Sequence, residues 1–145
     1  MRDIDAISGD VLDVALRLHR QLGPGLLESV YETVLAARLA QMGYRIARQR
    51  AIDIIFDGLH IDNAFRIDLL VDEQLIVEIK SIDRVSAVHA KQVLTYLRLT
   101  GLPVGLLINF GGETLKEGVR RYVNNYTPLR PSRALREPYS TNNGE

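Results

Sequence analysis

Two short apolar strands, joined by three polar residues, constrain the fold of this chain more than any other segment. In residues 65–71 the odd-numbered positions are apolar, and Asp68 points to the opposite face. In residues 75–80 the odd-numbered positions are again apolar, and Glu78 and Lys80 share the opposite face. A three-residue turn between the strands would place Asp68 directly across from Glu78, whereas a two-residue turn would put them on opposite faces. The pattern predicts a β-hairpin that can bring two carboxylates together.

The polar residues of this hairpin have two explanations. Alternation alone would put polar side chains on the solvent face of a half-buried hairpin. Leu70 and Ile76 share that face, however, so the carboxylates are partly covered and need a partner, for which a divalent cation is suited. Lys80 is one of only three lysines among 18 basic residues, and a compact ammonium is useful beside a water at such a site. These three polar groups together are what a magnesium-dependent phosphodiester hydrolase requires.

Length and composition restrict the remaining possibilities. The chain has 145 residues, the size of one domain, and 46% of them are hydrophobic, which is enough for a core. Cysteine is absent, which excludes thiolate zinc sites, iron–sulfur clusters and disulfides. Any metal ligands must be oxygens or one of the three histidines, and this set favours Mg²⁺ or Mn²⁺.

The termini and the charge address location and partners. The sequence has no apolar run long enough to cross a membrane and no secretory pattern at its N-terminus, so we expect a cytoplasmic protein without membrane contact. The net charge is zero, which gives no general signal of nucleic-acid binding. Local basic clusters do occur at 45–50 and 120–121, and they are equally explained as a solvated surface.

Hydrophobic periodicity and turn residues indicate the order of the elements. Ser8 is the expected N-cap of the first helix, Gly43 the stop of the second, and Ser86 and Gly101 the cap and stop of the third. The predicted fold class is α/β, a mixed central sheet flanked by helices in the order α-α-β-β-β-α-β. The helices are expected at 11–22, 26–42 and 88–100, and the strands at 44–56, 65–71, 75–80 and 104–109.

The C-terminal part is less regular. Segment 113–124 fits either a final helix or a final strand. Beyond residue 127 the chain is rich in proline, serine and asparagine, a composition typical of disorder. We therefore expect one domain at 1–126 and a disordered tail at 127–145.

Two further groups of polar residues are candidates for a site. Glu28 heads an apolar stripe of the second predicted helix, which favours a position facing a cleft. A first-turn glutamate is also explained by the helix dipole, worth about 0.3–1 kcal/mol. Gln92, Tyr96 and His89 lie one turn apart on the third predicted helix, an arrangement that is also common as simple packing.

Taken together, these motifs resemble a known family. The segment GLLESVY at 25–31 matches the motif for which the GxxExxY proteins are named. The order that follows, Asp68, then Glu78-Ile79-Lys80, then QVLTY at 92–96, resembles the PD-(D/E)XK nuclease superfamily and is most similar to its RecB and lambda-exonuclease branch. The resemblance covers about residues 7–124. The proline of the superfamily's motif is absent, since Ile67 precedes Asp68.

The resemblance implies a restriction-endonuclease-like core and a set of roles. The implied metal ligands for Mg²⁺ or Mn²⁺ are Asp68, Glu78, the carbonyl of Ile79 and Glu28, the last directly or through water. Lys80 would orient or deprotonate the attacking water, and Gln92 would position the nucleophile or the phosphate. The residues implied to bind substrate are Tyr96, Tyr31, Gly25, Arg66 and His89.

The resemblance thus implies a metal-dependent nuclease that cleaves nucleic acid, with DNA as the expected substrate, by in-line attack of water. The alternative is a non-catalytic module that uses the nuclease fold to bind nucleic acid or protein. Zero net charge and small size favour that alternative, unless the subunits of a homo-oligomer bind the substrate together.

Overall fold

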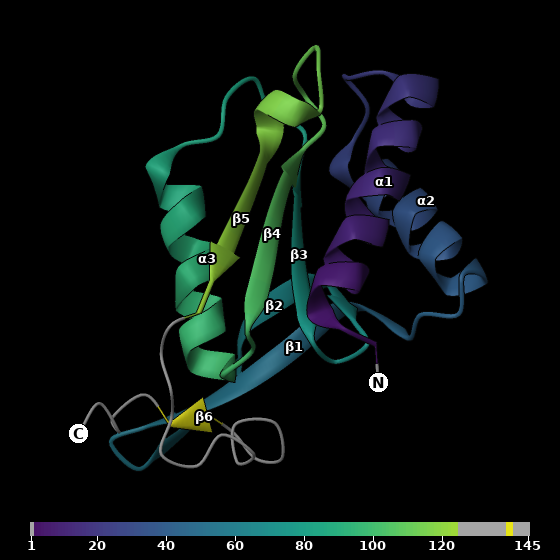
Figure 1. Cartoon of the computed structure of the whole chain (residues 1–145). Coiled ribbons are helices and arrows are strands. Elements are labelled where there is room, and N and C mark those ends of the chain that lie inside the picture. Colours follow the sequence, from purple (N-terminus) through teal and green to yellow (C-terminus); the bar gives the residue numbers. More distant parts are fainter. Residues whose placement is uncertain (1, 125–138, 141–145) are drawn as a thin grey trace.

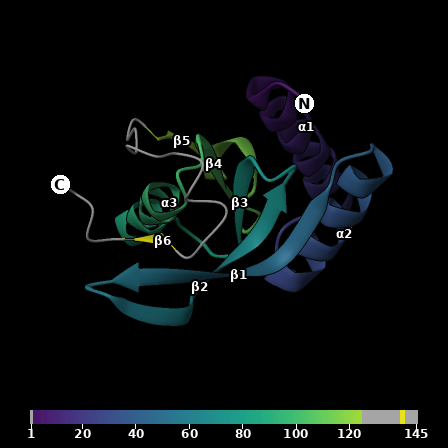
Figure 2. The ribbon, with the colours of Figure 1, turned by 90° about the horizontal axis from the view of Figure 1, so that it is seen from below.

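A mixed β-sheet with helices on both faces forms the fold (Figure 1). The computed structural model of the chain describes residues 2–124 and 139–140. Helices α1 (Ile4–Leu22) and α2 (Glu28–Gln41) lie on one face, and α3 (Ala87–Thr100) lies on the other (Figure 2). The strands are β1 (Ile46–Phe56), β2 (Leu59–Val71), β3 (Leu75–Lys80), β4 (Val104–Asn109), β5 (Val119–Val123) and β6 (Tyr139–Ser140).

The strand order in the sheet is β5-β4-β3-β2-β1-β6. The pairs β1–β2, β2–β3 and β4–β5 are antiparallel, whereas β3 and β4 are parallel and are connected through α3. The predicted α/β class, the mixed central sheet and the order α-α-β-β-β-α-β are confirmed. Strands β5 and β6 extend the predicted sheet at its two edges.

Two hydrophobic clusters hold the layers together, one on each side of the sheet. One contains residues of α1 and α2 with inward positions of the strands; the other lies beneath α3 around Val93 and Leu97. The central strands β3 and β4 are buried on both faces along nearly their whole length, which explains their continuous apolar sequences. Glu78 and Lys80 are the charged residues of β3; Lys80 is half-buried, whereas only 4% of Glu78 is exposed. A carboxyl group is therefore placed in the interior of the sheet.

The first helix starts earlier than predicted. It begins at Ile4, and Asp3 is its N-cap, because the Asp3 carboxylate accepts hydrogen bonds from the backbone N–H groups of Asp5 (3.1 Å) and Ala6 (3.3 Å). Ser8, the predicted cap, is instead buried within the helix. Aspartate and serine cap helices about equally well, so the prediction failed by choosing the later of two suitable residues.

The third helix matches its predicted boundaries. Ser86 is the N-cap of α3, and Gly101 ends it at a φ of 73°, in the left-handed region that glycine adopts without strain. The ambiguous segment 113–124 forms a short 3₁₀ turn (Lys116–Gly118) and then β5, so the strand alternative is correct there.

Strand β2 departs from regular alternation. Ile67 packs in the cluster beneath α3, whereas Leu69 packs in the cluster beneath α1 and α2. The expectation that the odd-numbered positions of 65–71 share one face is therefore wrong. The change of face occurs at Asp68, and the residue opposite, Gln49, has a φ of 52°, far from extended backbone.

The predicted disordered tail, 127–145, lies outside the described residues except for Tyr139–Ser140. These two residues form β6 and pair in parallel with Ile54 and Ile55 of β1. Among the residues that the structure describes, no helix is long and apolar enough to span a membrane.

Candidate active site

The hairpin between β2 and β3 has the predicted geometry. Leu69 pairs with Val77 and Val71 with Leu75, which leaves a three-residue connection at 72–74 and continues to Asp68 opposite Glu78. The pairing ends at this point. Asp68 Oδ2 accepts a hydrogen bond from the backbone N–H of Ile79 (2.9 Å), and Glu78 Oε1 lies 3.5 Å from the backbone nitrogen of Asp68. Each carboxylate is thus held by the backbone of the opposite strand.

Burial and the second carboxylate change the acidity of Glu78. Burial of the side chain and, next, the charge of Asp68 raise the pKa of Glu78 from 4.5 to about 9, while the charge of Lys80 opposes this change. At neutral pH and without a cation, Glu78 therefore holds a proton. Two carboxyl groups this close can both be ionised only if positive charge is supplied between them.

The backbone of Ile79 adds a third oxygen at this position. In a β-strand the N–H and C=O groups of one residue point to the same edge. Because the N–H of Ile79 donates to Asp68, its carbonyl faces the same opening between β2 and β3. Two carboxylates and one carbonyl are hard oxygen donors, and Mg²⁺ and Mn²⁺ prefer such donors, so these residues fit a divalent cation.

Lys80 and Tyr96 lie beside the carboxylate pair. Lys80 is two residues after Glu78 on the same strand, and its charge acts on that carboxyl group. Burial, followed by the charges of Glu78 and Asp68, raises the pKa of Tyr96. The Tyr96 ring stacks on Phe65 of β2, with ring centroids 4.1 Å apart. The structure therefore brings Tyr96 of α3 to the predicted pair.

Glu28 lies apart from the pair, at the start of α2. Its Oε2 accepts a hydrogen bond from the backbone N–H of Ser81, at 3.3 Å, and its side chain is exposed. Within residues 2–124 no three histidine, aspartate or glutamate side chains form a group that could hold a metal ion, so Glu28 does not complete such a group with Asp68 and Glu78.

A pocket of about 580 Å³ opens beside Glu28, and not over Asp68 and Glu78. It is lined by Gly25, Leu26, Leu27, Glu28, Ser29, Ser81, Ile82, Asp83 and Gly111. The pocket thus lies between the start of α2 and the loop that follows β3.

Tyr31 of the GxxExxY motif has a structural position. It is fully buried, and its ring stacks on Phe110 with centroids 4.4 Å apart. Its hydroxyl donates to the carbonyl of Gly23 (2.5 Å) and accepts from the N–H of Leu26 (3.2 Å), which fixes the turn between α1 and α2. Gly25 lies in that turn at a φ of 99°. The predicted substrate contact of Tyr31 does not fit this buried position.

The other predicted substrate and positioning residues lie at the surface or serve α3. Gln92 is exposed on α3, and Arg66 is exposed on β2. His89 Nδ1 accepts a hydrogen bond from the N–H of Ser86 (3.1 Å) and closes the capping box of the helix. Only the Nε2 atom of His89 is thus left for any other ligand.

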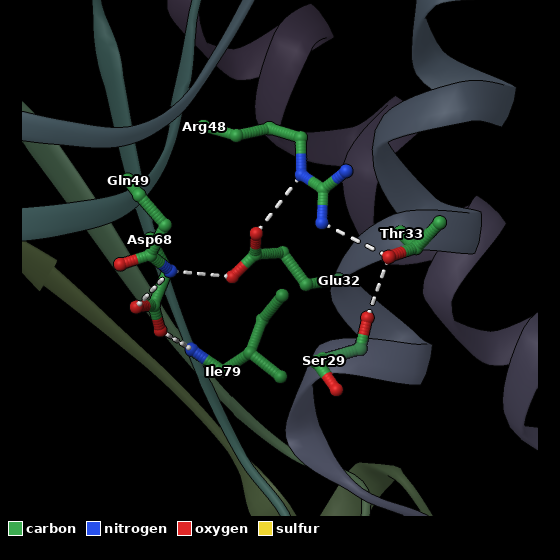
Figure 3. A network of polar contacts seen from close by, with 7 residues as sticks. All are labelled: Ser29, Glu32, Thr33, Arg48, Gln49, Asp68 and Ile79. Carbon is green, nitrogen blue, oxygen red and sulfur yellow. Dashed lines mark hydrogen bonds and ion pairs between the residues drawn. The ribbon is translucent and has the colours of Figure 1, made fainter.

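Two residues that were not predicted from the sequence are connected to the pair: Gln49 of β1 contacts Asp68, and Glu32 of α2 contacts Gln49. Glu32 is 6% exposed, and Gln49 donates from Nε2 both to Glu32 Oε1 (2.7 Å) and to Asp68 Oδ1 (3.2 Å), as Figure 3 shows. A signal for Glu32 was present, because it follows Tyr31 on the buried stripe of α2. No sequence signal marked Gln49, whose position depends on the register of the long hairpin.

Comparisons with known proteins place the chain in a family. No curated protein matches the chain. A solved structure described as the crystal structure of SSO0001 is similar at 18% sequence identity and a TM-score of 0.46; the match covers 75% of this chain and 55% of that one, so the chain spans about half the length of that protein. The model of the PD-(D/E)XK nuclease superfamily matches residues 5–122, the whole region that contains the hairpin and its surrounding helices. The chain belongs to the PD-(D/E)XK nuclease superfamily.

Proposed function

We propose that the chain is a nuclease that depends on Mg²⁺ or Mn²⁺ and hydrolyses phosphodiester bonds, with DNA as its substrate. The observation that carries the proposal is the pair of carboxyl groups at the point where β2 and β3 separate, the buried Glu78 and the half-buried Asp68. The superfamily supports nuclease chemistry. The motif at 25–31 further supports a place among the GxxExxY proteins, near the RecB and lambda-exonuclease branch.

Asp68, Glu78 and the Ile79 carbonyl would hold the divalent cation. When bound, the ion would supply positive charge to the phosphoryl oxygens and to the attacking water. The protein's part is to keep the two carboxylates at a fixed separation, which the hydrogen bond from Ile79 N–H to Asp68 supports. Glu28, which contacts the backbone of Ser81, would contact the ion only through water.

Lys80 would act on the water and on the phosphate. Its ammonium shares the face of Glu78, so it can orient an attacking water and stabilise negative charge that develops on a phosphoryl oxygen. Tyr96 and the exposed Gln92 lie on α3, and Gln92 would contact the phosphate once substrate covers that surface. These side chains would supply positioning and charge for in-line displacement in addition to the charge of the ion.

One observation favours a different function, a non-catalytic module that binds nucleic acid or protein. The net charge of zero supplies none of the general attraction to phosphate that nucleic-acid enzymes use. A homo-oligomer would offset this shortage, because two copies would contact one substrate together.

Cleavage of labelled linear and circular DNA and RNA in Mg²⁺ and in Mn²⁺ tests the proposal. Lys80→Ala should lower the cleavage rate about 100- to 1,000-fold, the usual effect of removing one preorganised charge donor. Lys116→Ala is the matched control, because Lys116 is exposed in the 3₁₀ turn before β5. This variant should cleave like the unmodified protein.

The outcomes separate the two functions. Metal-dependent cleavage that Lys80→Ala loses and Lys116→Ala keeps supports the nuclease. Cleavage that survives Lys80→Ala points to a contaminating enzyme. Binding of DNA without cleavage by any of the three proteins, in either metal, supports the non-catalytic module.

A further inference from the structure

We propose that Gln49, fixed in place by Glu32, is a positioning residue that holds Asp68 in its cation-binding orientation. The inference rests on the proposed function, because it deepens the account of the same site. Neither residue belongs to the predicted ligand set. Both are tied to Asp68 by an uninterrupted series of hydrogen bonds that begins on α2 (Figure 3).

Gln49 contacts Asp68 directly. In the β1–β2 ladder, Arg48 pairs with Leu69 and Arg50 with Ile67, so Gln49 lies opposite Asp68. Its Nε2 donates to Asp68 Oδ1 at 3.2 Å, while the N–H of Ile79 donates to Oδ2 at 2.9 Å. Each oxygen of the carboxylate is therefore held by one donor and keeps a lone pair for a cation.

Glu32 sets the orientation of the Gln49 amide. An amide can present either its oxygen or its NH₂ group to a neighbour, and only the NH₂ group helps a carboxylate. An ionised glutamate accepts but cannot donate, so Glu32 Oε1, at 2.7 Å, selects the NH₂ group. The second hydrogen of the same NH₂ group is then directed at Asp68.

Arg48 supplies positive charge to Glu32. Arg48 Nε donates to Glu32 Oε2 at 2.9 Å, and a second nitrogen of Arg48 donates to Thr33 Oγ1, also at 2.9 Å. The guanidinium supplies positive charge and a hydrogen-bond donor to the buried carboxylate of Glu32. Glu32 therefore orients Gln49 without adding an unbalanced negative charge beside Asp68.

The backbone of Gln49 supports a role beyond packing. Its φ of 52° lies in the left-handed region, which a residue with a long side chain seldom adopts and which glycine adopts freely. Backbone strain of this kind persists where surrounding structure imposes it, and it is concentrated at functional sites. Here it is associated with a side chain that reaches two carboxylates.

Mn²⁺ binding to the full chain, followed by the electron paramagnetic resonance of free Mn²⁺, tests the inference. Gln49→Gly removes the amide and relieves the left-handed backbone, so the melting temperature should stay the same or rise. The dissociation constant for Mn²⁺ should increase about 10- to 100-fold, as is usual when a ligand loses its supporting hydrogen bond. Asn63→Gly is the matched control, because Asn63 has a φ of 53° on the same hairpin, away from the site.

Two further variants, Glu32→Gln and Asp68→Ala, are measured in the same Mn²⁺ titration. Glu32→Gln keeps the shape but lets the amide of Gln49 face either way, so Mn²⁺ affinity should again fall. Asp68→Ala, which removes a ligand, should abolish the site. If Gln49→Gly proves unfolded, Gln49→Asn takes its place, since asparagine tolerates the left-handed region but is one methylene shorter.

Three results would overturn the inference. Affinity of Gln49→Gly equal to that of the unmodified protein, with Asp68→Ala inactive in binding, would reject the positioning role and leave the proposed function standing. A lower melting temperature with unchanged affinity would make Gln49 a structural residue. No Mn²⁺ binding by the unmodified protein would remove the proposed function and this inference together.

Discussion

Two glutamates with nearly equal burial, Glu32 and Glu78, have opposite electrostatic surroundings. Glu32 is 6% exposed and Glu78 is 4% exposed. Glu32 accepts a hydrogen bond from the guanidinium of Arg48 at 2.9 Å and another from Gln49. Glu78 faces a second carboxylate, Asp68, and among the described residues no salt bridge reaches it.

Under the proposed function, Glu32 is the acid that serves the fold and Glu78 is the acid that binds a cation. A buried charge is tolerated when the protein supplies the opposite charge, as Arg48 does for Glu32. Glu78 instead has its pKa raised to about 9, first by burial of its side chain and then by the like charge of Asp68. Among the described residues, Glu32 has a salt bridge to a basic side chain and Glu78 has none, although the charge of Lys80 acts on Glu78.

The largest effect is expected when Glu78 is replaced. Glu78→Gln keeps the shape of the side chain and removes the charge that a cation needs. Cleavage should fall by more than about 100-fold, since loss of a direct ligand exceeds the 10- to 100-fold effect of an outer partner. Glu113→Gln, at an exposed glutamate, is the control in the same assay. Equal cleavage rates for Glu78→Gln and the control would remove Glu78 from the site.

The next effect concerns pH. The pKa of Glu78 is raised in the folded protein, from 4.5 to about 9, so the unfolded chain releases this proton first as pH increases. In EDTA the free energy of unfolding should therefore fall between about pH 5 and pH 9, by up to about 1.4 kcal/mol per pH unit. Urea denaturation across this window measures it. Glu78→Gln should flatten the slope, and an unchanged slope would assign it to another group.

A smaller effect is expected when Glu32 loses its partner. Arg48→Met leaves a buried carboxylate without its guanidinium and should lower the free energy of unfolding by about 1–3 kcal/mol. Arg98→Met, at an exposed arginine of α3, should change it by less than about 0.5 kcal/mol. Urea denaturation of both variants at pH 7 provides the measurement. Equal stability of the two would mean that Glu32 is not held by Arg48.

The smallest effect should come from a third glutamate, Glu28. It is exposed and accepts one hydrogen bond, from Ser81 N–H at 3.3 Å. Glu28→Gln should change the free energy of unfolding by less than about 0.5 kcal/mol. Its Mn²⁺ affinity, measured by the resonance titration, should fall far less than that of Glu78→Gln. A loss as large as that of Glu78→Gln would make Glu28 a direct ligand.

The sequence predicted the parts of the site that depend on local pattern. The three polar residues between β2 and β3 fix the turn length, and alternation from that turn places Asp68 across from Glu78. Helix α3 was equally predictable, because Ser86 and Gly101 mark its ends. These features depend on neighbours within a few residues, and such interactions are visible in a sequence.

The contact between Gln49 and Asp68 was not predictable, because a β-bulge sets it. Near the turn at 57–58 the ladder pairs Ile54 with Ile61, but beyond the bulge Ile52 pairs with Phe65, a register shift of two residues. Without that shift, Asp68 would lie opposite residue 47. The bulge is stabilised by a hydrogen bond from the N–H of Asn63 to Asp53, between residues ten positions apart.

Thermal unfolding at pH 8 determines whether Asp68 and Glu78 form a cation site. Each protein is melted in EDTA and in Mg²⁺, for the unmodified chain and for Glu78→Gln. In EDTA the Glu78→Gln protein should melt at the higher temperature, because it lacks the ionisable buried acid. Mg²⁺ should raise the melting temperature of the unmodified chain and leave that of Glu78→Gln unchanged. Equal responses of the two proteins to Mg²⁺ would mean that Glu78 is not part of a cation site.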